Sequence, residues 1–310
     1  MKRNAIITFG IGYHKEDVEV FLESVQRNNI EADIFLFAGK NNLTLKQELG
    51  GYKNLHIVRY HESLIPKIIG KALMLVPFTG KLYARLIKAI HKLGDREWIH
   101  QFAFPLLHFM SKRFFVLNDF MKNHQYNNYL FTDIRDVLFQ SDPFKNILFN
   151  EIHSGIEPVK SRADELNKKW IEFTLTEDQA KSIYDKEIVC AGVILGSAWA
   201  FKWYIREFIK LTYDSLDTTI NKLGADQAIH SFLFHSGLET VNKVLHDNQS
   251  GDIVTLHHED ISQYQWNNDI MSHQNGEQIT IVHQYDRHPS LESRFKSKYK
   301  TYTENLKLVG

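Results

Sequence analysis

The sequence contains one cysteine, Cys190, among 310 residues, and it carries no net charge. One cysteine excludes an internal disulfide and the zinc motifs that are built from several cysteines, and it agrees with a reducing compartment. The 37 Lys and Arg residues are balanced by 37 Asp and Glu residues. Because no overall basic field results, we expect no nucleic-acid partner.

Long apolar runs are also missing. No run of about 18 apolar residues occurs, so we expect no transmembrane helix, and the first residues form a strand pattern rather than the apolar region of a signal peptide. We therefore expect a cytoplasmic protein. Its composition, 43% hydrophobic and 24% charged, is ordinary for a globular chain, and 310 residues are enough to bury a full core.

The N-terminal 60 residues alternate between strand and helix patterns. Strands are predicted at 5–9, 33–38 and 55–60, and helices at 15–28 and near 43–49. This alternation is typical of a Rossmann-like α/β fold, in which helices flank a mostly parallel central sheet. Ligands bind such sheets at the carboxyl ends of the strands, where Gly10 and Tyr13 would lie.

The segment YLFTDIRDVLFQSDPF, residues 129–144, places charged residues between two apolar, β-prone runs. Asp133, Arg135 and Asp136 follow the first run directly. Charged side chains are rare in such surroundings unless they are paired or bind a metal. Two neighbouring carboxylates are hard oxygen ligands for Mg²⁺ or Mn²⁺.

This segment resembles the metal-binding strand of GT-A glycosyltransferases, which carries an Asp-x-Asp motif. The spacing here is one residue longer, and a β-bulge at the strand end would accommodate the extra residue. We expect Asp133 and Asp136 to be the carboxylate pair, with Arg135 facing the diphosphate. Alternatively, Arg135 replaces a ligand and the protein acts without metal.

The resemblance extends to other residues in the order that the family shows. It implies that Tyr13 contacts the base, that Arg113 reaches the active site, and that Gly192 allows the backbone to approach the donor sugar. It further implies that Asp226, with Gln227, lies near the sugar or the acceptor.

The last patch of the resemblance follows a predicted strand at Ile279–Val282. His283 there matches the family's third metal ligand, and Arg287 or His288 matches the basic residue that holds the diphosphate. This loop favours retention of the anomeric configuration.

The resemblance implies a single GT-A-like domain over residues 1–310. Its parts are a nucleotide-binding half at 1–60, a helical insertion at 64–123, a metal, donor and acceptor half at 124–290, and a C-terminal tail at 291–310. The implied function is transfer of a sugar from a nucleoside diphosphate sugar, with a UDP-sugar favoured, to a glycan or glycolipid hydroxyl. Mn²⁺ or Mg²⁺ would be the cofactor.

Other functions remain open at this point. A nucleotidyltransferase would share the sheet and the carboxylates, but residues 10–16 offer only Lys15 to hold a triphosphate. A protein that binds nucleotide or sugar without catalysis is the second alternative, and a metal-dependent hydrolase is the third.

Two further segments have competing interpretations. Lys81–Leu93 has a basic amphipathic helix pattern, which is typical either of a solvated surface helix or of peripheral membrane contact through residues 64–93. His257 and His258 resemble metal ligands. Adjacent residues of a strand point to opposite faces, so we expect them to be polar loop residues that do not share an ion.

Overall fold

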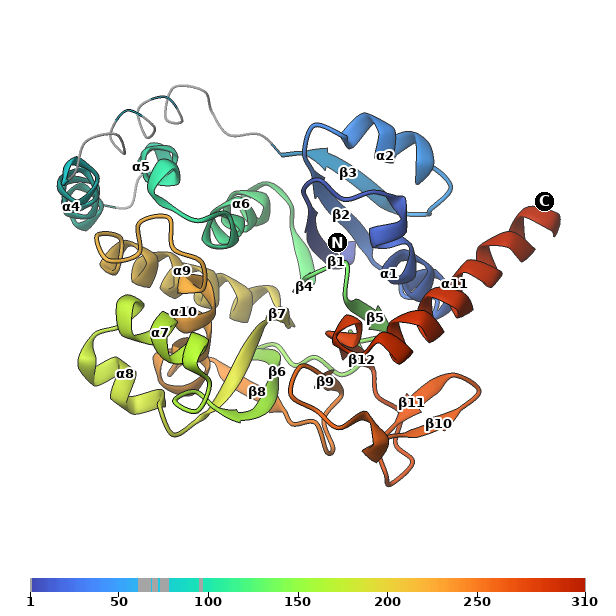
Figure 1. Ribbon diagram of the computed structural model, residues 1–310. Coiled ribbons are helices and arrows are strands. Elements are labelled where there is room, and N and C mark those ends of the chain that lie inside the picture. The colour runs from blue at the N-terminus through green and yellow to red at the C-terminus, as the bar shows by residue number, and fades with distance from the viewer. Residues whose placement is uncertain (1, 61–67, 69–71, 73–77, 95–96, 310) are drawn as a thin grey trace.

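The computed structural model describes residues 2–60, 68, 72, 78–94 and 97–309 (Figure 1). Its strands are β1 (Lys2–Gly10), β2 (Asp33–Ala38), β3 (Leu55–Arg59), β4 (Tyr126–Thr132), β5 (Val137–Phe139), β6 (Glu151–Lys160), β7 (Glu187–Ser197), β8 (Asn242–His246), β9 (Ile253–Thr255), β10 (Gln265–Asn267), β11 (Ile270–Ser272) and β12 (Ile281–His283). Its α-helices are α1 (Lys15–Arg27), α2 (Asn42–Glu48), α4 (Thr79–Lys92), α5 (Glu97–Ala103), α6 (Phe109–Asn123), α7 (Glu165–Thr174), α8 (Glu177–Ile183), α9 (Ala198–Asp214), α10 (Ala225–Phe232) and α11 (Pro289–Val309).

The central sheet has seven strands in the order β3-β2-β1-β4-β7-β6-β8. Strand β7 is antiparallel to both of its neighbours, and the other pairs are parallel. Since β1 and β4 are adjacent and parallel, their carboxyl ends reach the same edge of the sheet. The loop after Gly10 and the acidic segment after Thr132 therefore lie close to each other. The predicted α/β fold with a mostly parallel sheet is confirmed.

A second sheet, in the order β5-β12-β9, extends the acidic segment. Strand β12 runs antiparallel to β5 and pairs His283 with Val137. The chain thus leaves β4, bends at residues 134–136 and enters a different sheet. The predicted β-bulge at the end of β4 is wrong, because the pairing of β4 with β7 runs without a register shift to Thr132. The extra residue of the motif lies in the bend, where no strand pairing is disturbed.

The predicted elements at the N-terminus match β1, α1, β2, α2 and β3 within a few residues. In the described part of the predicted insertion, residues 78–94 and 97–123 contain α4, α5 and α6, while most of 61–77 lies outside the described residues. The predicted tail is the helix α11, which contacts α1 (Figure 1). Leu291, Phe295 and Tyr299 of α11 are buried, because they recur on one face of the helix.

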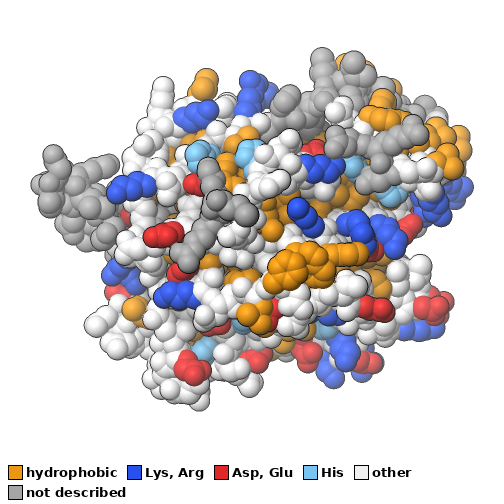
Figure 2. Space-filling model, turned by 180° about the vertical axis from the view of Figure 1, so that it is seen from behind, with side chains coloured by type: hydrophobic (Ala, Val, Ile, Leu, Met, Phe, Trp, Pro, Cys, Tyr) orange, Lys and Arg blue, Asp and Glu red, His pale blue; other side chains and the backbone are white. Residues whose placement is uncertain are grey.

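Helix α4 exposes an apolar stripe on the outside of the molecule. Leu82 and Leu86 are 70% and 55% exposed, and Leu93, directly after the helix, is 87% exposed. Arg85 and Lys88 of the same helix lie 3.6 Å and 3.4 Å from the carboxylate of Asp217. In the face seen in Figure 2, hydrophobic side chains lie beside Lys and Arg side chains.

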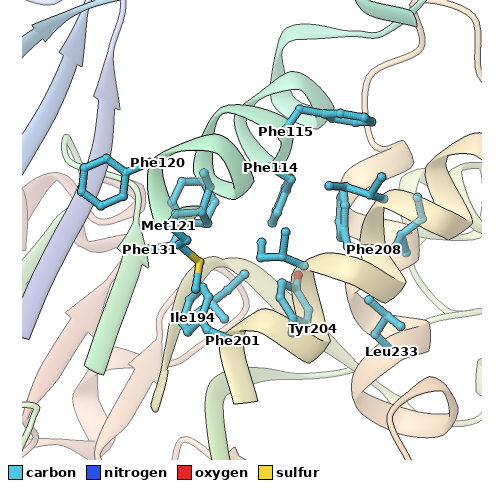
Figure 3. Packing of buried hydrophobic residues seen from close by; sticks show 14 of the residues in the cluster. Phe114, Phe115, Phe120, Met121, Phe131, Ile194, Phe201, Tyr204, Phe208 and Leu233 are labelled. Carbon is cyan, nitrogen blue, oxygen red and sulfur yellow. The ribbon is translucent and has the colours of Figure 1, made fainter. Parts of the chain in front are cut away.

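The two faces of the central sheet are covered by separate hydrophobic clusters. Along β1, Ala5 and Ile7 belong to the cluster beneath α6 and α9, and Ile6 belongs to the cluster beneath α1 and α2. This follows from the alternation of side chains along a strand. Phe114 of α6 stacks on Phe208 of α9 with ring centroids 3.7 Å apart (Figure 3). This stacking helps to hold α6 in place, and α6 carries Arg113, one of the predicted site residues.

Candidate active site

All three predicted metal ligands meet at the carboxyl edge of the central sheet. Asp133 follows β4, Asp136 precedes β5, and His283 ends β12. One ligand atom from each lies within 4.8 Å of the other two. Strand pairing produces this arrangement, since His283 pairs with Val137 and the backbone amide of Gln284 donates to the carbonyl of Asp136 at 2.8 Å.

The chemistry of these three side chains fits a divalent cation. His283 is 1% exposed, and neither of its ring nitrogens has a hydrogen-bond partner among the described residues. A buried polar group without a partner destabilises the fold, and a cation would satisfy one of these nitrogens. Burial raises the pKa of Asp136, and neighbouring Asp133 adds to that rise. A cation would favour the ionised form of both carboxylates.

Gly192 leaves the space that these ligands occupy. The backbone amide of Asp133 donates to the carbonyl of Gly192 at 2.8 Å, which holds β7 against the predicted metal ligands. A Cβ atom on Gly192 would overlap the ring of His283 and would lie 3.1 Å from Oδ2 of Asp133. Glycine is therefore required at this position for steric reasons.

Arg113 connects two carboxylates inside the protein. Its Nη1 donates to Oδ1 of Asp133 at 2.6 Å, and its Nη2 lies 3.8 Å from Oδ2 of Asp226. Arg113 and Asp226 are both 4% exposed. Burial raises the pKa of Asp226, and the guanidinium of Arg113 opposes that rise. The arginine thereby fixes the positions of both acids.

Gln227 is held by the backbone of β7. Its Nε2 donates to the carbonyl of Val189 at 2.6 Å, and its Oε1 accepts from the amide of Ala191 at 3.0 Å. With both ends of the amide engaged, Gln227 fixes the short segment that leads to Gly192. The sequence predicts Gln227 beside the sugar or acceptor, and the structure places it on the pocket wall.

A pocket of about 260 Å³ joins these groups. Of the predicted site residues, it is lined by Arg113, Asp133, Gly192, Asp226, Gln227, His283 and Arg287. Sequence reasoning missed Glu157, Asp164 and Trp170, which also line it. A larger cavity of about 670 Å³ lies between α6 and α9, and it is lined by none of the predicted site residues.

The remaining predicted residues lie outside the lining of this pocket. Burial raises the pKa of Tyr13, with Arg135 opposing and Asp133 and Asp136 adding to the rise. Tyr13 thus lies within electrostatic range of the acidic residues. Gly10 is buried, and a Cβ there would lie 3.0 Å from Cδ1 of Leu36.

The basic residues of the site differ in what they contact. Nη2 of Arg135 lies 3.1 Å from Oδ2 of Asp286. His288 is in contact with the carbonyl of Leu256 through its Nε2, at 2.8 Å. Arg287 lines the pocket, and its side chain is 45% exposed. Of the two alternatives for the diphosphate-binding position, Arg287 is therefore the one that reaches the pocket.

The prediction that His257 and His258 are polar loop residues is confirmed, but their side chains do not point to opposite faces. Both residues lie in a turn after β9, closed by a hydrogen bond from the amide of Glu259 to the carbonyl of Leu256 at 3.2 Å. Their rings stack with centroids 4.2 Å apart, and both face Glu157 of β6. The rule that neighbours point to opposite faces applies to strands, and this turn is not one.

No protein-family model and no curated protein matches the sequence. Among solved structures, the chain is similar to the galactosyltransferase LgtC in complex with donor and acceptor sugar analogs. The TM-score is 0.50 at 13% sequence identity, over 96% of this chain and 95% of that one. Together with the strand order, this similarity shows that the chain has the GT-A glycosyltransferase fold.

Proposed function

We propose that the protein is a glycosyltransferase, which moves a sugar from a nucleoside diphosphate sugar to a hydroxyl of a glycan or glycolipid. One observation carries this proposal: Asp133, Asp136 and His283 converge within 4.8 Å at the sheet edge where GT-A enzymes bind their donor. The pocket beside them offers room and fixed charge for a sugar.

Asp133, Asp136 and His283 would hold the divalent cation. Two carboxylates and an imidazole suit Mn²⁺ better than Mg²⁺, which prefers oxygen ligands. When bound, such a cation acts as a Lewis acid that neutralises the charge of the leaving diphosphate. We favour UDP as the nucleotide, with Tyr13 beside its base and Gly10 at the turn that approaches it.

Side chains of the protein supply the other charges. Arg287 lines the pocket and would stabilise the negative charge of the diphosphate. Arg135, which contacts Asp286, would add positive potential near the diphosphate. His288 would support the loop that carries Arg287 through its contact with Leu256. Asp226, oriented by Arg113, would face the sugar. We favour retention of the anomeric configuration, and the anomeric proton of the product in an NMR spectrum would test this choice.

Helix α4 supports the proposal that the protein contacts a membrane surface peripherally. Leu82 and Leu86 form an exposed apolar stripe, and Lys81 and Lys92 belong to the same helix. Such a helix binds anionic lipid through both its apolar side chains and its charges. None of the helices in the described ranges is long and apolar enough to cross a bilayer.

A nucleotidyltransferase is less well supported. Lys15, the single Lys or Arg among residues 10–16, is the first residue of α1 and lies 3.6 Å from Glu19 within that helix. It is therefore engaged within α1, where a nucleotidyltransferase would need several basic groups directed at a triphosphate.

The proposal is tested by thermal unfolding with UDP-, GDP-, CMP- and dTDP-sugars, each with and without Mn²⁺, followed by a donor-turnover assay. A bound ligand raises Tm by mass action. We expect a metal-dependent rise with one nucleotide family and turnover of its sugar. Asp136→Asn should abolish the metal response and lower turnover about 10²–10³-fold, the typical loss for one group that stabilises transition-state charge.

Asp178→Asn, an exposed change in the first turn of α8, is the matched control and should leave both readouts unchanged. Binding without turnover would indicate a non-catalytic binding protein. A rise in Tm that is indifferent to metal would show that Arg135 acts in place of a ligand. No response to any donor would contradict the proposed function.

A further inference from the structure

A second group of side chains that could hold a metal lies beside the same pocket, which two of its three members line. Glu157 of β6 faces His257 and His258 in the turn after β9, and one ligand atom from each lies within 4.8 Å of the others. These residues share no member with the Asp133, Asp136 and His283 group. They converge from elements that are separate in sequence, since β6 and β9 are in contact in the fold.

Glu157 is the informative member of this group. It is 4% exposed, and its Oε2 makes no hydrogen bond of ordinary length among the described residues, because its contacts with the imidazoles of His257 and His258 are longer. A buried carboxylate in this state is costly unless an opposite charge or a cation is close. The same Oε2 atom lies nearest to both imidazoles, so the side chain is directed at the space between them.

Two of the three ligand–ligand distances match those around a tetrahedral ion. Oε2 of Glu157 lies 3.6 Å from Nδ1 of His257 and 3.4 Å from Nε2 of His258. Both distances exceed the usual 2.7–3.2 Å of a hydrogen bond. Metal–ligand distances of about 2.0–2.2 Å in a tetrahedron give ligand–ligand separations of roughly 3.3–3.6 Å. The two Glu157–imidazole separations therefore fit a single ion, and the two imidazoles offer ligand atoms within 4.8 Å of each other.

We propose that Glu157, His257 and His258 form a binding site for a divalent transition-metal cation of the Zn²⁺ class. Two imidazoles and one carboxylate are a ligand set that zinc accepts while keeping a fourth position open. Asp164, whose Oδ2 lies 4.0 Å from Nε2 of His258, is the nearest additional acid. Its Oδ1 is occupied in capping α7 at Asn167.

The open position faces the pocket, because Glu157 and His257 both line it. A cation there would present a coordination site to an oxygen of a bound molecule. This last step rests on the proposed glycosyltransferase function, in which that oxygen belongs to the acceptor. Binding of the cation itself does not depend on that function.

The experiment is a Co²⁺ titration of the full chain after dialysis against a chelator, followed by competition with Zn²⁺. Co²⁺ is the probe because tetrahedral Co²⁺ with nitrogen and oxygen ligands has strong visible absorption bands. We expect tetrahedral bands that Zn²⁺ removes. His258→Gln and His257→Gln should each abolish the bands and lower the amount of Zn²⁺ bound at saturation by one equivalent. His257 is 46% exposed at its side chain, so this variant keeps the test valid if the others fail to fold.

His56→Gln is the matched control, because His56 also lies near a carboxylate, 3.9 Å from Asp33, and should leave the bands unchanged. Asp136→Asn should retain the bands while losing the Mn²⁺ response, which separates this site from the proposed catalytic one. No tetrahedral bands in the unmodified protein, or bands that persist in His257→Gln and His258→Gln, would overturn the proposal. If the bands occur but no nucleotide sugar is turned over, the metal site stands and the acceptor role does not.

Discussion

Gly192→Ala is the substitution that tests the geometry of the acidic site most directly. The added Cβ would overlap Cε1 and Nε2 of His283 and would lie 3.1 Å from Oδ2 of Asp133. His283 is 1% exposed, and its backbone pairs with β5 on one side and β9 on the other. The ring therefore has to leave its position, or β7 has to shift.

The expected loss of stability follows from two opposing effects. Adding a methyl group to a closely packed site costs about 1–3 kcal/mol. The lower entropy of the unfolded alanine chain offsets about 0.4–1 kcal/mol. The net decrease in the free energy of unfolding is roughly 1–2 kcal/mol, and at about 2–4 °C for each kcal/mol it lowers Tm by roughly 2–8 °C.

The assay is thermal unfolding with and without Mn²⁺, in single and double variants. Gly192→Ala should lower Tm and lose the Mn²⁺ response. Gly51→Ala, which has nothing within 4 Å of its added Cβ, should have no destabilising effect. In a His283→Ala background the cost of Gly192→Ala should fall to near zero, since the clashing ring is gone. An unchanged cost in that background would refute the steric argument.

Two further predictions concern other parts of the molecule. His246 has its pKa lowered from 6.5 to about 4, mainly by burial and also by His153; it stays neutral in the fold while the unfolded chain binds a proton below pH 6.5. The contribution of His246 to the free energy of unfolding is therefore fully present above pH 6.5 and falls by about 3 kcal/mol as the pH drops toward 4. Urea unfolding across this pH range should show a smaller fall for His246→Asn than for the unmodified protein. On α4, the double substitution Leu82→Gln and Leu86→Gln should reduce binding to vesicles that contain phosphatidylserine, measured by sedimentation at low salt. Equal binding of the unmodified protein and the double variant would mean that α4 is a solvated surface helix.

Much of the fold could be predicted because local patterns and tertiary demands agree in the N-terminal half. The alternation of β1, α1, β2, α2 and β3 is visible in the spacing of apolar residues, which the parallel sheet buries on both faces. The small sheet of β5, β12 and β9 could not be predicted in the same way. Its strands have three residues each, too few to show a period, and β5 lies more than 100 residues from its partner β12.

The two proposed metal-binding groups show where sequence reasoning succeeds and fails in the site. Asp133 and Asp136 can be recognised in the sequence because they interrupt an apolar run. Burying a charged side chain in such a run is unfavourable without a compensating partner. Glu157 gives no such signal, since Gly155 and Pro158 beside it are typical of a turn, whereas the structure places Glu157 in β6. His257 and His258 are recognisable in the sequence as a pair, but the direction that their side chains share depends on the turn that begins at Leu256. A residue far away in the sequence holds this turn, because the amide of Leu256 donates to the carbonyl of His283 at 3.0 Å. The backbone of a residue in the first group thus orients the second, so a change that displaces β12 should perturb both sites together.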